Sequence, residues 1–196
     1  MNLKYVSFVS KNSPYTKVVE DFLLPTLKKW NLSYDIDYIE NKGSWINNIQ
    51  YKPQFLKNML LKHKCPIVSL DADATIEKNP ILFETLQDYD IGAYYLDWRT
   101  WYNKTYDKKE LLGGTLYFNY NEKILNFLDQ WIVAQSKQVQ YAQKVLQELI
   151  QNSSDIKIYE LPLTYCFIDC NRFSEIKKQA VIIHHQISRK LRNWRS

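Results

Sequence analysis

The stretch that decides the fold is Pro66-Ile67-Val68-Ser69-Leu70-Asp71-Ala72-Asp73, in which a short apolar run ends on two carboxylates one residue apart. A short, near-continuous apolar run is typical of a buried strand in a parallel sheet. Open α/β sheets bind their ligands beyond the carboxyl ends of such strands. Two carboxylates at that position can hold a hard divalent cation through oxygen, and the cation can carry a diphosphate. The stretch therefore predicts a metal and nucleotide site at a strand's end.

The same spacing of aspartates occurs twice more, in Asp35-Ile36-Asp37 and Asp88-Tyr89-Asp90. The first pair alternates within a half-buried strand pattern, which places both carboxylates on the solvent face. The second pair precedes a strand instead of ending one. Context therefore selects Asp71 and Asp73 as the candidate metal pair.

Strand and helix patterns alternate upstream of this pair. Apolar residues predict strands at 4–10, 34–39 and 66–70 and helices at 14–30 and 54–63, the first helix capped by Ser13 ahead of Pro14. This β-α-β-α-β order implies a parallel sheet with right-handed crossovers. Downstream, we expect strands at 90–96, 115–119, 156–161 and 181–184, and two helices within 121–151 that break near Ser136. The predicted fold is an α/β, Rossmann-like domain with a mixed, mostly parallel central sheet flanked by helices.

The chain has 196 residues, 45% of them hydrophobic, and no linker-like segment divides it, so we expect a single domain over 1–196. Its first residues lack the apolar region of a signal peptide, and no run is long enough to span a bilayer. The odd number of cysteines, three, favours a reducing compartment over a disulfide framework. We therefore expect a cytoplasmic protein, in the host cytoplasm if its source is a virus or phage.

The net charge of +5 is concentrated in a basic C-terminal tail that contains Arg189, Lys190, Arg192 and Arg195. Such a tail can contact nucleic acid or a membrane surface, or be solvated. Together with six Trp and 15 Tyr, it leaves open a non-catalytic nucleic-acid-binding module. A sugar-nucleotide nucleotidyltransferase is disfavoured because the segment 10–14 after the first strand has no glycine.

Only four glycines are present, and none lies in a glycine-rich phosphate loop, so a metal is the obvious group to neutralise a bound diphosphate. The adjacent Gly113-Gly114 predicts either a close backbone approach or an ordinary bulge or turn. His184 ends the apolar strand 181–184 and could complete a shell begun by Asp71 and Asp73. A mixed Asp and His site suits Mn²⁺. His185 points to the opposite face, so at most one of the two imidazoles serves.

Five segments in order resemble the small GT-A glycosyltransferases that contain an Asp-x-Asp motif, which are nucleotide-diphospho-sugar transferases of bacterial, phage or viral type. The segments are Gly43-Ser44-Trp45, Lys52-Pro53-Gln54-Phe55, Val68 to Ala74 with Pro80 and Phe83, Gly114 to Asn119, and Ile183 to Arg189. The resemblance covers the chain from Val6 to Arg192. It implies a nucleotide-binding half, 1–73, and a donor-sugar and acceptor half, 74–196, which carries the basic tail.

The resemblance also implies roles for individual residues. Asp73 is expected to ligate Mn²⁺ or Mg²⁺ directly, Asp71 to share metal and ribose contacts, and His184 to be the third protein ligand. The remaining expected contacts are with the base (Ser10, Tyr15), the nucleotide and its diphosphate (Lys52, Ser188, Arg189, Lys190) and the donor sugar (Gly114, Thr115).

One departure from the family pattern lies at Ala142, where an acidic residue commonly precedes Gln143. We expect Asp97 to substitute for that acid as the catalytic residue, with Trp98 and Arg99 forming a sugar-binding rim; an exposed loop aspartate is the alternative. The implied activity is that of a metal-dependent hexosyl- or pentosyltransferase that uses a UDP-linked donor. The hydroxyl acceptor could be a glycan, a protein or a modified nucleobase.

Overall fold

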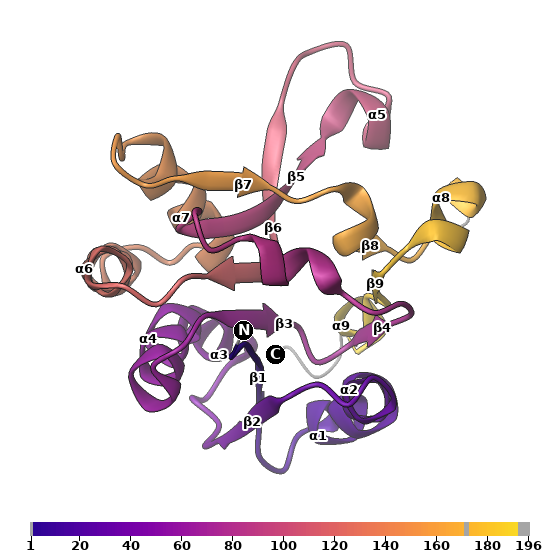
Figure 1. The fold of residues 1–196 in the computed structure, drawn as a ribbon, viewed down its shortest axis with the longest axis horizontal. Coiled ribbons are helices and arrows are strands. Elements are labelled where there is room, and N and C mark those ends of the chain that lie inside the picture. Colours follow the sequence, from indigo (N-terminus) through magenta and orange to yellow (C-terminus); the bar gives the residue numbers. More distant parts are fainter. Residues whose placement is uncertain (1, 171–172, 192–196) are drawn as a thin grey trace.

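A mixed sheet forms the centre of the computed structural model, which describes residues 2–170 and 173–191 without the side chain of Lys190. In spatial order its strands are β2 (Tyr34–Ile39), β1 (Lys4–Ser10), β3 (Ile67–Leu70), β6 (Lys109–Phe118), β5 (Ile91–Asp97) and β7 (Ile158–Glu160) (Figure 1). β1 is parallel to both of its neighbours and β5 to β7, whereas β6 is antiparallel to β3 and β5. This confirms the predicted α/β fold with a mixed, mostly parallel sheet.

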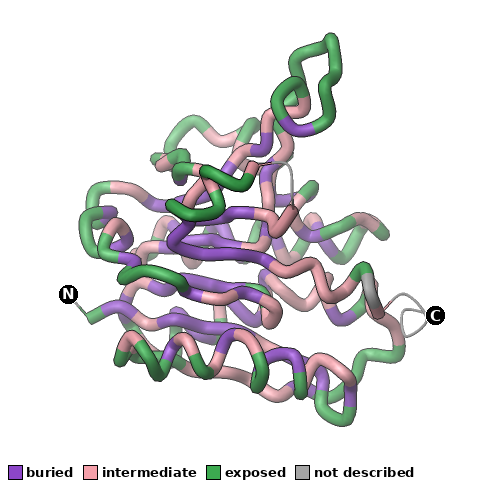
Figure 2. Tube along the Cα trace, turned by 90° about the vertical axis from the view of Figure 1, so that its right-hand side faces the viewer, coloured by how far each residue is buried: buried purple, intermediate pink, exposed green. Residues whose placement is uncertain are grey.

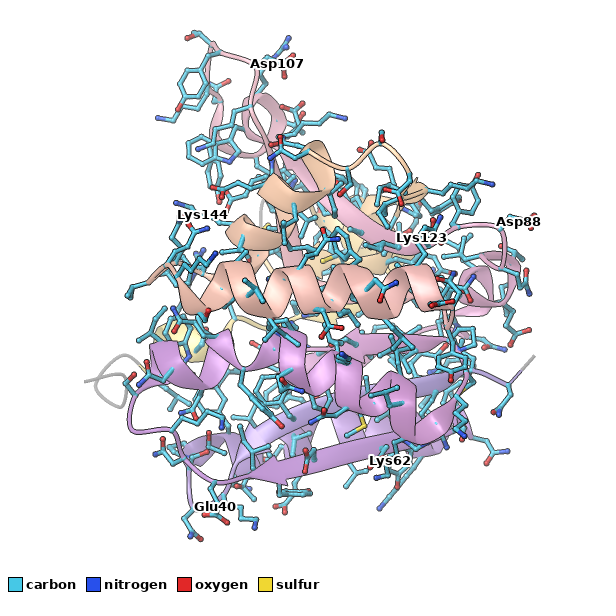
Figure 3. The ribbon with its side chains drawn as sticks, turned by 90° about the vertical axis from the view of Figure 1, so that its left-hand side faces the viewer. Glu40, Lys62, Asp88, Asp107, Lys123 and Lys144 are labelled. Atoms are coloured by element: carbon cyan, nitrogen blue, oxygen red, sulfur yellow. The ribbon has the colours of Figure 1, made fainter. Side chains whose placement is uncertain are left out.

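Helices cover both faces of the sheet. The longest ones, α4 (Lys52–His63) and α6 (Glu122–Ser136), lie side by side on one face, where α7 (Ala142–Gln151) joins them (Figure 3). Their buried side chains pack on Ile67, Leu116 and Phe118 of the sheet. The other face packs Val68 and Leu70 against the helical segment from Pro14 to Lys29. Alternate side chains of β3 therefore enter two different cores, as expected for a strand buried on both sides.

The helical segment 14–29 matches the predicted helix but is not regular. Ser13 caps it by accepting a hydrogen bond from the Tyr15 N–H at 3.2 Å, and Pro14 is its first residue. A π-helical turn, η1 (Val19–Leu23), separates α1 (Pro14–Val18) from α2 (Leu24–Lys29). The turn lies just before Pro25, which has no N–H to donate to a regular helical ladder.

A second, smaller sheet brings the C-terminal region next to the end of β3. It consists of β4 (Ala74–Ile76), β9 (Ile182–His184) and β8 (Phe167–Ile168), in that spatial order. β4 and β9 pair antiparallel, with Ala74 opposite His184. Neither β4 nor β8 was expected from the sequence. Their pairing places His184 beside the residues that follow β3.

β6 starts at Lys109, six residues before the predicted strand, and it contains an irregularity at the glycine pair. Leu116 pairs with Ala93, but Leu112 pairs with the next residue of β5, Tyr94, so residues 113–115 bulge out of the β5–β6 ladder. Before β6, the chain projects from the sheet as a largely exposed excursion that contains α5 (Trp98–Tyr102) (Figure 2).

The remaining elements are short. They are α3 (Trp45–Gln50), η2 (Ile81–Thr85), η3 (Leu163–Tyr165), α8 (Ser174–Gln179) and α9 (Ile187–Lys190). None of the helices in the described part of the chain combines the length and the apolarity that crossing a membrane requires.

Candidate functional site

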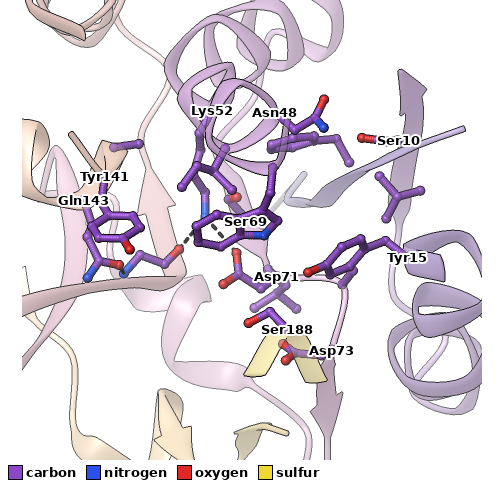
Figure 4. Close-up of a pocket in the computed structure, with 18 residues that line it drawn as sticks. Ser10, Tyr15, Asn48, Lys52, Ser69, Asp71, Asp73, Tyr141, Gln143 and Ser188 are labelled. Atoms are coloured by element: carbon purple, nitrogen blue, oxygen red, sulfur yellow. Dashed lines mark hydrogen bonds and ion pairs between the residues drawn. The ribbon is translucent and has the colours of Figure 1, made fainter. Parts of the chain in front are cut away.

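A cavity of about 220 Å³ lies where β1 and β3 end, between α3, the start of α7 and the bulge of β6 (Figure 4). Polar side chains from distant parts of the chain reach it. Among the residues that line it are Ser10, Tyr15, Trp45, Asn48, Lys52, Asp71, Asp73, Tyr141, Gln143 and Ser188. The cavity thus lies at the carboxyl ends of parallel strands, the edge at which open α/β sheets bind their ligands.

Lys52 and Asp71 form an ion pair in this cavity. The Lys52 ammonium lies 2.9 Å from Asp71 Oδ1 and also donates to the carbonyl of Gly113 (Figure 4). The Lys52 side chain is only 12% exposed, whereas that of Asp71 is 52% exposed. The cavity therefore has a fixed cation on one wall and a carboxylate with a free edge toward solvent beside it.

Asp73 and His184 face each other deeper in the site. Asp73 Oδ2 accepts a hydrogen bond from the Ile187 N–H at 2.8 Å, and Asp73 Oδ1 lies 3.9 Å from His184 Nδ1. Burial raises the pKa of Asp73, but His184 and the Ile187 N–H outweigh it, so the net pKa is lowered. The carboxyl group is therefore ionised at neutral pH.

The His184 ring is oriented from its other nitrogen. Thr115, which is fully buried, lies with its hydroxyl oxygen 2.8 Å from His184 Nε2. His184 Nδ1 is buried and has no hydrogen-bond partner among the described residues. A buried polar atom without a partner is uncommon in a folded protein and calls for an explanation, such as an ion or an ordered water molecule at that point.

Gly114 permits the close approach on which this arrangement depends. A Cβ at position 114 would lie 2.8 Å from His184 Cε1, closer than real Cβ atoms come to a neighbouring ring. The Gly114 carbonyl also accepts the Asp71 N–H at 2.9 Å. The glycine pair therefore forms a bulge and also makes a close backbone approach, because the bulge brings the backbone close to His184 and to the aspartate pair.

The two histidines lie in separate surroundings. His185 Nε2 is 2.9 Å from the hydroxyl of Thr75, and its Nδ1 is 3.3 Å from Asp169 Oδ2. Its ring packs against Phe22 at 5.0 Å. Only His184 faces the aspartate pair, in agreement with the opposite orientations expected for adjacent residues.

The predicted nucleotide contacts are only partly brought together. Ser10, Tyr15, Lys52 and Ser188 line the cavity with the aspartates. Arg189 is exposed on α9 and is not in the lining. Lys190 is in the same helix, but its side chain, like Arg192 and Arg195, lies outside the described residues.

Asp97, Trp98 and Arg99 are not in the lining of the cavity. Asp97 caps α5 instead, since its carboxylate accepts hydrogen bonds from the Arg99 N–H at 2.9 Å and the Thr100 hydroxyl at 3.0 Å. Arg99 pairs with Asp107 at 2.5 Å. The structure thus gives Asp97 a structural role, and the catalytic role expected for it has no support from its position.

Trp45, Asn48, Tyr141 and Gln143 line the cavity but were not predicted as site residues. Trp45 and Tyr141 meet edge to face at 5.8 Å although they are far apart in sequence. Gln143 Oε1 accepts the Gly113 N–H at 3.3 Å. Trp45 belongs to the Gly43-Ser44-Trp45 segment and Gln143 follows Ala142, both of which resemble family motifs, so the resemblance is the sequence signal that could place these two side chains at the site.

The donor atoms fit a hard divalent ion, although the described residues contain no assembled group of three metal-binding side chains. Asp73 Oδ1 and the unpartnered His184 Nδ1 face each other, and Asp71 is one residue from Asp73. Two carboxylate oxygens and one imidazole suit Mn²⁺, whereas Mg²⁺ prefers a shell of oxygen atoms. Lys52 occupies one oxygen of Asp71, so a third ligand from this residue requires its other oxygen or a shift of the ammonium.

The chain has the fold of the GT-A-type glycosyltransferases, as comparison with solved structures shows. A glycosyltransferase involved in the glycosylation of the major capsid of PBCV-1 superimposes with a TM-score of 0.71, at 12% identity, over 95% of this chain and 93% of that one. Mouse xyloside xylosyltransferase 1 gives a TM-score of 0.58 at 12% identity, with 96% and 99% of the two chains covered.

The galactosyltransferase LgtC, solved with donor and acceptor sugar analogues, gives a TM-score of 0.55 at 12% identity, over 93% of this chain and 87% of that one. No protein-family model and no curated protein sequence matches the chain. These neighbours establish the fold, while the function has to be argued from the site.

Proposed function

We propose that the protein is a metal-dependent glycosyltransferase. It moves a sugar from a nucleoside diphosphate sugar donor, in which the sugar is linked to UDP, to a hydroxyl group of an acceptor. The observation that carries the proposal is the meeting of Lys52, Asp71 and Asp73 in one cavity at the ends of parallel strands, with Tyr15 on an adjoining wall. A cation, a carboxylate pair and an aromatic ring match the diphosphate, the metal and the base of such a donor. The fold shared with glycosyltransferases supports the same conclusion.

The metal would be held by Asp73 and His184, with Asp71 contributing from the cavity side. When bound, a divalent ion would supply positive charge to the diphosphate, the leaving group of the reaction. His184 is prepared for this role because Thr115 contacts its Nε2 and leaves Nδ1 facing Asp73.

Lys52 adds a second, permanent positive charge. Its ammonium is anchored by Asp71 and the Gly113 carbonyl, so it is already oriented before a ligand enters. Negative charge accumulates on the diphosphate as the bond to the sugar breaks, and a pre-oriented cation stabilises that charge where it develops. Ser10 and Tyr15, at the end of β1 and the start of α1, lie on the wall that would face the base.

Isothermal titration calorimetry with UDP in the presence of Mn²⁺, and again in EDTA, tests this function. We expect binding that weakens at least about tenfold in EDTA, because the metal links the diphosphate to the carboxylates. UMP is the matched control ligand, since it keeps the base and ribose but lacks the diphosphate, and its binding should not depend on Mn²⁺. Equal binding of UDP with and without the metal would contradict a metal-dependent site. A panel of UDP-hexoses and UDP-pentoses then identifies the donor by release of UDP.

A further inference from the structure

Three aromatic rings gather on the excursion between β5 and β6, hereafter the arm (residues 97–109). Trp98 lies 5.3 Å from Tyr102 and 6.1 Å from Tyr106, between ring centroids. Tyr102 is 46% exposed and Tyr106 is 50% exposed. Figure 1 shows α5 and the following loop projecting away from the sheet. The rings therefore form an aromatic cluster that is open to solvent beyond the body of the fold.

Polar contacts hold this cluster in one arrangement. The Lys108 ammonium lies 3.6 Å from the centroid of the Trp98 ring, and Arg99 pairs with Asp107 across the arm. The Asp97 cap fixes the start of α5. Because these contacts order the rings before any ligand binds, the binding free energy would not be reduced by the entropy cost of ordering them.

The arm is connected to the cavity by a chain of side-chain hydrogen bonds. The Trp98 indole N–H donates to Glu110 Oε2 at 2.9 Å, and Gln143 Nε2 donates to Glu110 Oε1 at 3.3 Å. Gln143 lines the cavity. Along β6, Lys109 at the arm and Gly113 at the cavity are four residues apart, or about 14 Å at the rise of an antiparallel strand. The cluster and the cavity are thus linked through the side chains of Glu110 and Gln143.

We propose that the aromatic cluster of the arm binds a saccharide chain as the acceptor of the transfer reaction, which rests on the proposed function of the cavity. The flat C–H faces of a sugar ring pack on aromatic rings, while its hydroxyl groups bond to neighbouring polar side chains such as Arg99 and Asp107. Trp and Tyr combine a large apolar face with a polar tip at low cost in side-chain entropy.

The charge of the arm favours a saccharide over a nucleic acid. The arm contains four cationic side chains, Arg99, Lys104, Lys108 and Lys109, and two anionic ones, Asp97 and Asp107; Glu110, which directly follows the arm and accepts the Trp98 N–H, adds a third negative charge. Protein surfaces that bind nucleic acids carry an excess of positive charge, which neutralises the phosphates. A nearly balanced surface with exposed aromatic rings instead suits a neutral polyhydroxyl ligand.

Binding of the full-length protein to an array of immobilised oligosaccharides tests this proposal, with the double variant Tyr102→Ala/Tyr106→Ala as the probe. Both tyrosines are exposed, so their removal should leave the fold and UDP binding unchanged. The matched control is Tyr34→Ala, which removes a 36% exposed tyrosine from β2, at the opposite edge of the sheet. We expect the wild type and the control to bind at least one saccharide, and the double variant to lose that binding at least about tenfold.

Each outcome decides between distinct explanations. Equal saccharide binding by the double variant would overturn the assignment to the arm, and so would a wild type that binds UDP with Mn²⁺ but no saccharide. Salt-sensitive binding of single-stranded DNA that requires the two tyrosines would replace the saccharide by a nucleic acid. Failure of the wild type to bind UDP would instead count against the proposed function of the cavity.

Discussion

The segments Asp71-Ala72-Asp73 and Asp88-Tyr89-Asp90 have the same spacing of carboxylates but different surroundings. Asp71 and Asp73 point into the cavity, and each has an oxygen that no described N–H or ammonium binds within hydrogen-bond distance. Asp90 is 5% exposed and is surrounded by donors: the Lys157 N–H at 2.8 Å, the Asn121 amide at 3.2 Å and the Lys123 ammonium. The spacing of two aspartates is therefore informative only where the carboxylate oxygens remain available to a ligand.

The largest effect is expected from Asp73→Asn. The amide keeps the shape of the side chain and can still accept the Ile187 N–H, but it loses the charge that a metal needs. Turnover of a UDP-sugar in Mn²⁺ should fall at least about 100-fold, measured by release of UDP, because charge stabilisation of the leaving group is lost. Asp88→Asn is the matched control and should retain activity. Full activity of Asp73→Asn would refute the site.

Asp90→Ala should give the complementary result, a loss of stability without a loss of UDP binding. Removing the carboxylate leaves the Lys157 N–H and the Asn121 amide without their acceptor, which costs about 2–3 kcal/mol. Urea unfolding measures this change. Asp88→Ala, at an exposed turn, should stay within about 0.5 kcal/mol of the wild type. If Asp90→Ala also abolished UDP binding in its folded state, the two pairs would not differ as described.

A smaller, site-specific difference is expected between the adjacent histidines. His184→Ala removes the ring nitrogen that faces Asp73 and should weaken Mn²⁺ binding about tenfold or more. His185→Ala removes contacts with Thr75 and Asp169 and should affect Mn²⁺ binding much less. Titration of Mn²⁺ followed by calorimetry distinguishes them. Equal losses of Mn²⁺ affinity in both variants would contradict the assignment of His184 alone as the metal ligand.

The smallest effect concerns pH. Burial raises the pKa of Asp90, but Lys123 and the Lys157 N–H outweigh it, so its net pKa in the folded protein is lowered. Its stabilising contribution is therefore complete above the ordinary Asp pKa of 3.8 and is lost as the pH falls through the lower folded value. Urea unfolding between pH 7 and pH 3 should show a shallower pH dependence for Asp90→Asn than for the wild type. Identical slopes would contradict the assigned pKa shift.

The central strands could be predicted from sequence because their signals are local. Strands 4–10 and 34–39 occur with the predicted bounds, and the predicted break near Ser136 is where α6 ends. Apolar alternation and helical periodicity are properties of a short window, so they need no knowledge of tertiary contacts. The aspartate pair at the end of β3 was predicted for the same reason.

The rest of the site depends on contacts between distant segments. Trp45 and Tyr141 come together only because α3 and α7 flank the same cavity. β4 and β8 are too short to show a period, and they form because β9 pairs with both. The position of Asp97 after a strand predicts a catalytic residue, yet the next residues start α5 and the aspartate caps that helix. A helix-cap signal and a catalytic signal are indistinguishable at that position without the fold.

Soaking a crystal of the protein in Mn²⁺ and UDP would show whether Asp73 and His184 hold a metal ion that carries the diphosphate. We expect anomalous manganese density between Asp73 Oδ1 and His184 Nδ1, in contact with the diphosphate, with the base on the side of Tyr15. UDP bound in the cavity with no manganese at these two atoms, or manganese bound at another place in the molecule, would contradict it.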